Sequence, residues 1–409
     1  MSPDWFWFWL VLLKWVTAQM QQPLSPDYAC STDRIVHPEI GGLQILDLLA
    51  TNMQNHTFPA LPIWGIDKTY ENMNFCNVTV VYTHPGWGDS IKVWIYLPSQ
   101  DWNGRFQATG GGGFVTGATT DGGHSSDTTS DASAWALTSP GNVNWPLLVD
   151  FASVAIHDMA VIGKAITESF FGMPPQHSYF HGASTGGRQG LMLAQRYPKD
   201  FDGIIAICPA INWVEFIVAN LWPQFIMNQL HEYPRGCELD AITEAAISAC
   251  DSLDGVTDGI ISLPALCDFN PQTLVGKSFH CNGIASVFTS AAAAVADAAW
   301  SGPRSSSGGF QWFGIGRDAE LGSSGIGIAT TTCEEDGTCK GYPFPISLDW
   351  IKLWLVKDFN FDFSTITHNQ WDALFHTSIN EYDSIIGTSD SDLSEFRRAG
   401  GKTLTWHGL

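Results

Sequence analysis

The stretch YFHGASTGGRQG, Tyr179 to Gly190, places a serine between glycines where an apolar run meets a segment with helical spacing. Its centre, Gly182 to Gly186, fits the pattern G-x-S-x-G, in which a tight and strained turn presents a serine hydroxyl between a strand and a helix. An ordinary glycine turn is the alternative, because 40 glycines in 409 residues produce chance matches. The strand before the motif and the helix after it favour Ser184 as a nucleophile.

Alternating segments on both sides of the motif predict the fold class. The predicted strands are Val78 to Tyr82, Ile91 to Tyr96, Phe151 to Ile156, Tyr179 to His181, Gly203 to Cys208 and Lys402 to Trp406. The predicted helices in this part are Met159 to Phe171 and Arg188 to Tyr197. Strands that alternate with helices of about ten residues are typical of a parallel sheet with crossover helices. The sequence therefore predicts an α/β fold.

The pattern changes after about Trp222. Cysteines become frequent, and Ser301 to Gly327 is rich in glycine and serine without strong periodicity, which indicates a surface loop. Helical patterning returns at Leu348 to Asp358 and at Asn369 to His376. We expect an insertion in the core fold, with the units 19–221, 222–393 and 394–409.

Composition and charge exclude some partners. The chain is 44% hydrophobic, enough for a large core, and its 19 Lys and Arg against 41 Asp and Glu give a net charge of -22. Such an acidic chain repels polyanions, so we expect no nucleic-acid partner. Phe6 to Leu13 is apolar but too short to span a bilayer, and we expect no membrane partner.

Three features predict secretion. Val16-Thr17-Ala18 follows the apolar block as a signal-peptidase pattern, so residues 1–18 are read as a signal peptide, although Asp4 and the lack of an early basic residue are atypical. The sequons Asn55-His56-Thr57 and Asn77-Val78-Thr79 predict glycans. Nine cysteines suit an oxidising compartment. We therefore expect an extracellular protein.

An odd number of cysteines leaves at least one thiol without a partner in the chain. Cys208 falls inside a predicted apolar strand, where a buried free thiol is tolerated. Proximity in the sequence suggests the disulfides Cys30–Cys76, Cys237–Cys250, Cys267–Cys281 and Cys333–Cys339.

A nucleophilic serine needs amide donors for the oxyanion that forms when it attacks an ester. The N–H of Thr185, at the start of the helix, is one candidate. The glycine run Gly110 to Gly113, with the amides of Gly111 and Gly112, is the other, because residues without side chains let the backbone approach a substrate. A flexible connection is the alternative for this run.

At this point the chain resembles the fungal tannase and feruloyl esterase family of α/β-hydrolases, secreted serine esterases of phenolic acid esters. The resemblance runs through most of the chain, and its blocks occur in the family's order. They are Gly110 to Phe114, Thr120 to His124, Ala134 to Leu137, Tyr179 to Gly190, Tyr197 to Gly203 and Cys250 to Ile261. The resemblance implies an α/β-hydrolase core with Ser184 as the nucleophile and a lid domain, from about Trp222 to Leu393, that selects the substrate.

Two departures from the family affect the expected activity. Ala183 stands where the family has a cysteine that is disulfide-bonded beside the catalytic histidine, so this tether is absent. The segment Lys402 to Leu409 resembles the approach to the family's catalytic aspartate, which implies a chain truncated before the acid and the base. The remaining downstream histidines are not expected to replace that base; they are His231, His280, His368, His376 and His407. We therefore expect these 409 residues to be inactive or nearly so.

A calcium site is expected in the lid. Asp251, Asp254 and Asp258 fall within eight residues among glycines, and clustered carboxylates suit Ca²⁺. As sequence alone, an acidic turn is an equal alternative. The resemblance implies structural Ca²⁺ held by these aspartates and by the carbonyls of Val256 and Ile260.

The leading hypothesis is a serine carboxylesterase that acts on a small-molecule or polysaccharide-linked phenolic ester. The chemistry would pass through an acyl-enzyme at Ser184. Eighteen tryptophans supply aromatic surface, although most of these rings are expected in the core. The alternative is a calcium-binding protein that keeps the ligand pocket without turnover. The sequence does not select among ferulate, p-coumarate and gallate esters, and it gives no oligomeric state.

Overall fold

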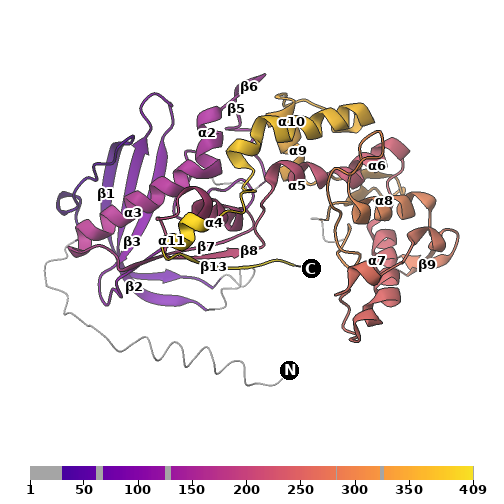
Figure 1. Cartoon of the computed structure of the whole chain (residues 1–409), viewed down its shortest axis with the longest axis horizontal. Helices are drawn as coiled ribbons and strands as arrows, with labels where there is room; N and C mark the ends of the chain where they lie inside the picture. Colours follow the sequence, from indigo (N-terminus) through magenta and orange to yellow (C-terminus); the bar gives the residue numbers. More distant parts are fainter. Residues whose placement is uncertain (1–29, 61–67, 125–129, 282, 323–326, 409) are drawn as a thin grey trace.

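The computed structural model describes residues 30–60, 68–124, 130–281, 283–322 and 327–408. The expected signal peptide, residues 1–18, lies outside the described residues. In Figure 1 the two sheets and helix α3 lie on one side of the molecule, and a lobe built around α6, α7 and α8 lies on the other. Helices α5 and α10 run between these two parts.

A four-stranded parallel sheet forms the centre of the core. Its order is β13-β8-β7-β4, with every neighbouring pair parallel. The strands are β4 (Arg105–Thr109), β7 (His177–Ala183), β8 (Gly203–Ile207) and β13 (Lys402–Trp406). This arrangement confirms the α/β prediction. Because Ala183, Ile207 and Trp406 share one register, the residues after these three strands emerge at the same edge of the sheet.

A second, antiparallel sheet precedes it in the sequence. It consists of β1 (Gln44–Phe58), β2 (Tyr70–Thr83) and β3 (Ile91–Pro98), in that order. Alternate residues of β3 are buried, as expected for a strand with one face on the core. Strands β3 and β4 do not pair, and a cavity of about 280 Å³ lies between them. One isolated bridge, Val93 with Thr120, connects β3 to the loop that follows β4.

The segment 145–171, which precedes β7, is helical throughout. α2 (Trp145–Val149), the π-helical turn η3 (Asp150–Val154) and α3 (Ala155–Phe171) follow one another without interruption. The strand predicted at Phe151 to Ile156 is therefore wrong. Residues 150–153, 155 and 156 are all buried, and a run buried on every side has no period that separates helix from strand. This stretch is long and apolar enough to cross a membrane, but 67% of its most apolar window is buried, as in the core helix of a globular domain.

The loop after β4 and helix α5 share one aromatic core. α4 (Thr185–Arg196) follows β7, and α5 (Trp213–Ala219) follows β8. Trp213 and Phe114 pack there with residues from later in the chain, including Trp350 and Trp354. These come from the segment that contains α9 (Pro345–Asp349), the π-helical turn η7 (Trp350–Leu355) and α10 (His368–Ile386). Sequence positions far apart thus form a single core, in which Trp213, Trp350, Trp354 and Trp371 are fully buried.

The lobe has a core of its own. Its helices are α6 (Trp222–Leu230), α7 (Gly236–Cys250) and α8 (Ser290–Ser301), and all three contribute buried side chains to a separate hydrophobic cluster. Trp222 and Phe225 of α6 and Ala298 of α8 pack in the aromatic core instead. Its short strands are β9 (Ser278–Cys281), β10 (Ile284–Val287), β11 (Thr331–Cys333) and β12 (Cys339–Gly341). The remaining elements of the chain are η1 (Thr32–Arg34), β5 (Leu137–Ser139), β6 (Asn142–Val143), η4 (Asp251–Asp254), η5 (Pro264–Leu266), η6 (Pro271–Leu274), η8 (Phe363–Thr365) and α11 (Ser394–Arg398).

Four disulfides join the eight cysteines expected to pair. Cys30–Cys76 and Cys333–Cys339 are confirmed. The other two expected pairs are wrong, because the bonds are Cys237–Cys281 and Cys250–Cys267. Cys237 and Cys250 begin and end the same helix, α7, which holds them about 20 Å apart at 1.5 Å per residue. Each therefore pairs with a segment folded back against its own end of the helix.

Candidate active site

Ser184 lies at a strained turn between β7 and α4. Its backbone has φ 58° and ψ -118°, outside the regions that non-glycine residues normally occupy. Two hydrogen bonds hold this conformation: the Ser184 N–H donates to the carbonyl of Ile207 at 2.9 Å, and the Ser184 carbonyl accepts from Ala210 N–H at 3.1 Å. The residue is exposed, and its hydroxyl makes no hydrogen bond within the described part of the chain. The turn thus presents a free hydroxyl to solvent.

The glycines around Ser184 are required by close backbone contacts. A Cβ added to Gly182 would lie 2.5 Å from the backbone of Gly186. One added to Gly186 would lie 2.8 Å from the carbonyl oxygen of Gly111. Contacts this short exclude a side chain, so the turn is closed only with glycine at both positions.

The glycine run Gly110 to Gly113 packs directly against this turn. Gly186 N–H donates to the Gly111 carbonyl at 2.9 Å, and the Thr185 hydroxyl donates to the Gly113 carbonyl at 2.7 Å. Gly111 N–H donates to Oε1 of Gln189 at 3.2 Å. Because this amide already has a partner, Gly112 is the better placed of the two glycines expected to donate to an oxyanion.

A buried arginine anchors the helix behind the serine. Arg188 is 0% exposed and donates to the carbonyls of Phe151 and Ala152. Its guanidinium lies over the rings of Phe151 and Trp213, and burial lowers the pKa of Arg188 to about 9. The sequence pattern does not single out this residue, because the carbonyls that it binds belong to a segment whose pattern predicts a strand.

The histidines do not assemble at the serine. His407 and Cys208 follow β13 and β8 at the edge where Ser184 follows β7, so one strand separates His407 from the serine. The His407 ring bonds the Gly408 carbonyl instead. Cys208 is the free cysteine, but it is exposed beyond the end of β8, so its expected burial is wrong. The other histidines lie in the lobe or in α10: His231, His280, His368 and His376.

The acidic loop of the lobe folds around its own backbone amides. Asp251 is buried and accepts from the N–H groups of Asp258 and Gly259, each at 3.1 Å. Asp254 accepts from Val256 N–H, and Asp258 accepts from Ile260 N–H. The donor set is all oxygen, which suits Ca²⁺. Its three carboxylates do not form one of the convergent ligand groups found among the described residues, so calcium here stays a prediction.

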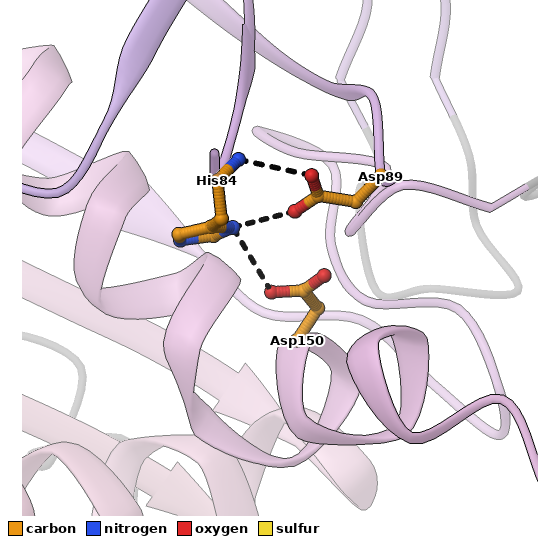
Figure 2. A group of neighbouring side chains, drawn as sticks. All are labelled: His84, Asp89 and Asp150. Carbon is orange, nitrogen blue, oxygen red and sulfur yellow. Dashed lines mark hydrogen bonds and ion pairs between the residues drawn. The ribbon is translucent and has the colours of Figure 1, made fainter. Parts of the chain in front are cut away.

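A second polar cluster appears only in the structure. His84, after β2, lies between two carboxylates: Nδ1 is 2.5 Å from Asp89 Oδ2, and Nε2 is 3.0 Å from Asp158 Oδ2. Nδ1 also lies 3.8 Å from Asp150 Oδ1 (Figure 2). Burial, together with the charges of Asp89 and Asp158, raises the pKa of Asp150 to about 8. The pair His84 and Asp89 is far in the sequence from Asp150 and Asp158, so the four residues form no motif that sequence reasoning could detect.

The sheet, its crossover helices and the serine turn after β7 define the chain as an α/β-hydrolase. The chain matches the family described as "Tannase and feruloyl esterase" over residues 76–409. It is 42% identical to a probable feruloyl esterase of Arthroderma benhamiae, covering 91% of this chain and 71% of the relative, and 28% identical to a tannase of Aspergillus oryzae, covering 88% and 70%. The chain belongs to the tannase and feruloyl esterase family.

Solved structures give the same relationship. The tannin acyl hydrolase of Aspergillus niger superposes with a TM-score of 0.79 at 26% identity, covering 92% of this chain and 72% of that one. A feruloyl esterase B from Aspergillus oryzae superposes with a TM-score of 0.68, also at 26% identity, covering 90% and 72%. The resemblance noted from the sequence blocks is thereby confirmed.

Proposed function

We propose that this protein is a carboxylic ester hydrolase of phenolic acid esters that uses Ser184 as its nucleophile. The observation that carries the proposal is the exposed hydroxyl of Ser184 on a strained turn closed by Gly182 and Gly186. Membership of the tannase and feruloyl esterase family supports the substrate class. The alcohol half of the ester is a small molecule or a polysaccharide.

The geometry supports an acyl-enzyme mechanism. Attack by the Ser184 oxygen on the ester carbonyl forms a tetrahedral oxyanion, for which the Thr185 and Gly112 amides are the proposed donors. Collapse of this intermediate expels the alcohol and leaves the phenolic acyl group on Ser184, and water then releases the acid. The Thr185 hydroxyl bond to Gly113 fixes the glycine run beside the helix start.

We propose that the 409-residue polypeptide itself performs this reaction slowly. The Ser184 hydroxyl has no imidazole partner among the described residues, so it stays protonated and weakly nucleophilic. Loss of a general base lowers serine-hydrolase rates by several powers of ten. The competing function is a binding protein that retains a phenolic-ester pocket without turnover.

A phosphonate phenyl ester separates these two functions. We expect slow, stoichiometric phosphonylation of Ser184, located by peptide mass spectrometry and absent from Ser184→Ala. Free imidazole added as an external base should accelerate the labelling in proportion to its concentration. Ligand binding without any adduct, or an adduct that persists in Ser184→Ala, would sink the esterase proposal and favour the binding protein. Hydrolysis of methyl ferulate, with the same variant as control, tests the substrate class.

We also propose that Ca²⁺ binds the acidic loop and stabilises the lid domain, residues 222–393. Asp251, Asp254 and Asp258 would supply carboxylates, and Val256 and Ile260 would supply carbonyls. The Cys250–Cys267 disulfide beside Asp251 supports a structural role for this loop. Calcium should raise the unfolding temperature of the parent chain but not of Asp254→Asn. An equal effect on both proteins would argue against the site.

We also propose that the protein is secreted, because of its disulfides and its sequons. Four disulfides suit an oxidising compartment, and Asn55 of the first sequon is exposed. The side-chain oxygen of Asn77, in the second sequon, is buried within β2. We therefore expect a glycan at Asn55. A mobility shift on deglycosylation that disappears in Asn55→Gln checks this, and an unchanged shift in that variant would contradict it.

A further inference from the structure

The cluster around His84 joins three parts of the chain. His84 and Asp89 flank the turn between β2 and β3, Asp150 begins η3, and Asp158 lies in α3. All four side chains are buried or nearly so, and the three aspartates contact a single imidazole. Figure 2 shows Asp89 and Asp150 directed at the same ring nitrogen of His84. The ion pairs found here among the described residues include no lysine or arginine.

Among the four residues, Asp150 is the one whose carboxylate lacks hydrogen bonds. It is 0% exposed, and neither of its carboxylate oxygens has a hydrogen-bond partner among the residues that the structure describes. A buried carboxylate without partners is costly, because it loses its hydration and regains nothing. Its repulsion from Asp89 and Asp158 adds to that cost. A cation at this point would remove both penalties.

Three candidate ligand atoms lie close together in this cluster. Nδ1 of His84 and one oxygen each of Asp89 and Asp150 lie within 4.8 Å of one another. The other oxygen of Asp89, Oδ1, is held by the Thr83 hydroxyl at 2.6 Å and by the His84 N–H at 2.9 Å. Asp89 is therefore oriented with Oδ2 toward the imidazole and Asp150.

The second nitrogen of His84 has the partner typical of a metal-bound histidine. Nε2 faces Asp158 Oδ2 at 3.0 Å, and the Tyr82 hydroxyl donates to the same oxygen at 3.1 Å. A carboxylate that accepts the distal N–H of a histidine fixes the tautomer in which the other nitrogen is a ligand. Asp158 and Tyr82 would thus orient His84 without touching the ion.

We propose that His84, Asp89 and Asp150 bind one divalent transition-metal ion, of the class of Zn²⁺ or Mn²⁺. One imidazole with two carboxylates suits these ions, whereas Ca²⁺ prefers oxygen ligands alone. The ion fastens the β2–β3 turn to the helical segment η3–α3. That segment also supplies the Phe151 and Ala152 carbonyls that hold Arg188 behind the serine turn. The site is structural, and it is separate from the acidic loop of the lobe.

Metal titration of the full, untagged chain tests this proposal. Cys208→Ser serves as the parent for every arm, because the exposed Cys208 thiol would also bind Zn²⁺. The chain is stripped with a chelator, held in excess Ca²⁺ to occupy oxygen-only sites, and titrated with Zn²⁺ at fixed neutral pH by calorimetry. We expect one saturable site whose occupation raises the unfolding temperature.

Three substitutions identify the ligands. Asp150→Asn should weaken Zn²⁺ binding by at least about tenfold. Asp158→Asn, which removes the partner that orients His84, should weaken it by about tenfold. Asp200→Asn, in the separate His157–Asp200 pair, should leave the affinity unchanged. Absence of a saturable site, full affinity in Asp150→Asn, or an equal loss in Asp200→Asn would each overturn the proposal.

A spectrum of the parent chain keeps the test decisive if Asp150→Asn does not fold. Co²⁺ in place of Zn²⁺ should give the visible ligand-field bands of a nitrogen and oxygen site, and Zn²⁺ should displace them. Neither result depends on Ser184 or on ester turnover. A Co²⁺ spectrum that remains that of the hydrated ion would exclude the site.

Discussion

The backbone of Ser184 costs energy because a residue with a Cβ occupies a region that glycine normally fills. Such strain amounts to about 1–3 kcal/mol and persists only where the surroundings enforce it. Here the carbonyl of Ile207, the last residue of β8, and the N–H of Ala210, in the loop after it, fix the turn. The turn thereby holds the Ser184 side chain in an exposed position at the end of β7.

Gly182→Ala tests this close packing. Its methyl group would meet the Gly186 backbone at 2.5 Å, so we expect a loss of about 1–3 kcal/mol in the free energy of unfolding. Gly112→Ala is the matched control, because a Cβ there meets nothing within 4 Å. Urea unfolding measures both. Equal stability of the two variants would show that the turn relaxes around a side chain.

At the scale of elements, helix α3 is joined to the loop before β8 by a histidine–aspartate pair. His157 Nδ1 lies 2.7 Å from Asp200 Oδ2, and its ring stacks on Tyr197. Burial lowers the pKa of His157, but the hydrogen bond and charge of Asp200 outweigh it, so the pKa is raised overall. The protonated form is therefore favoured in the folded state.

This raised pKa predicts a pH dependence of stability. The folded chain binds the proton more tightly than the unfolded chain, so the contribution is complete below the ordinary histidine pKa of about 6.5. It is lost as the pH rises through the raised value. Asp200→Asn should flatten this part of the stability profile, whereas His177→Gln, at an exposed histidine of β7, should not. Denaturant unfolding across neutral pH measures the stability of each protein. A profile of Asp200→Asn that runs parallel to that of the parent chain would refute the assignment of this pH dependence to the His157–Asp200 pair.

At the scale of the whole molecule, the described residues form two large hydrophobic clusters outside the lobe and a separate one within it. The first lies between the two sheets, α3 and α4, the second joins α5, η7 and α10, and the third lies in the lobe of α6, α7 and α8. Residues 345–386 contribute to the second cluster although they follow the lobe in sequence. A chain with separate cores is expected to unfold in more than one step.

Two of the three disulfides of the lobe should differ in their effect on stability. Cys237–Cys281 closes a separation of 44 residues, and Cys333–Cys339 closes one of 6. Chain entropy predicts about 4 kcal/mol for the first and about 2 kcal/mol for the second. Paired alanine substitutions followed by calorimetry measure this. The larger effect should appear in the transition of the lobe alone, and equal losses would contradict the entropic account.

Sequence patterns predicted those elements whose local signals agreed with their surroundings. Strand β13 has the predicted bounds, Lys402 to Trp406. The serine turn was predicted from the positions of Gly182 and Gly186, which the close backbone contacts of the turn require. The helix at 150–156 was missed because burial on all sides removes the amphipathic period. The pairing of Cys237 was missed because proximity along the chain ignores the length of a rigid helix.

By itself, the sequence determined the class of the protein: the alternation of elements, the serine turn and the order of the family's blocks are all local properties. Only the tertiary structure decided which distant groups meet. It placed the glycine run beside Thr185, Arg188 behind the serine turn, and three aspartates around His84. The reason is physical, because a motif is written in neighbouring residues, whereas a binding cluster depends on how helices and strands are packed together.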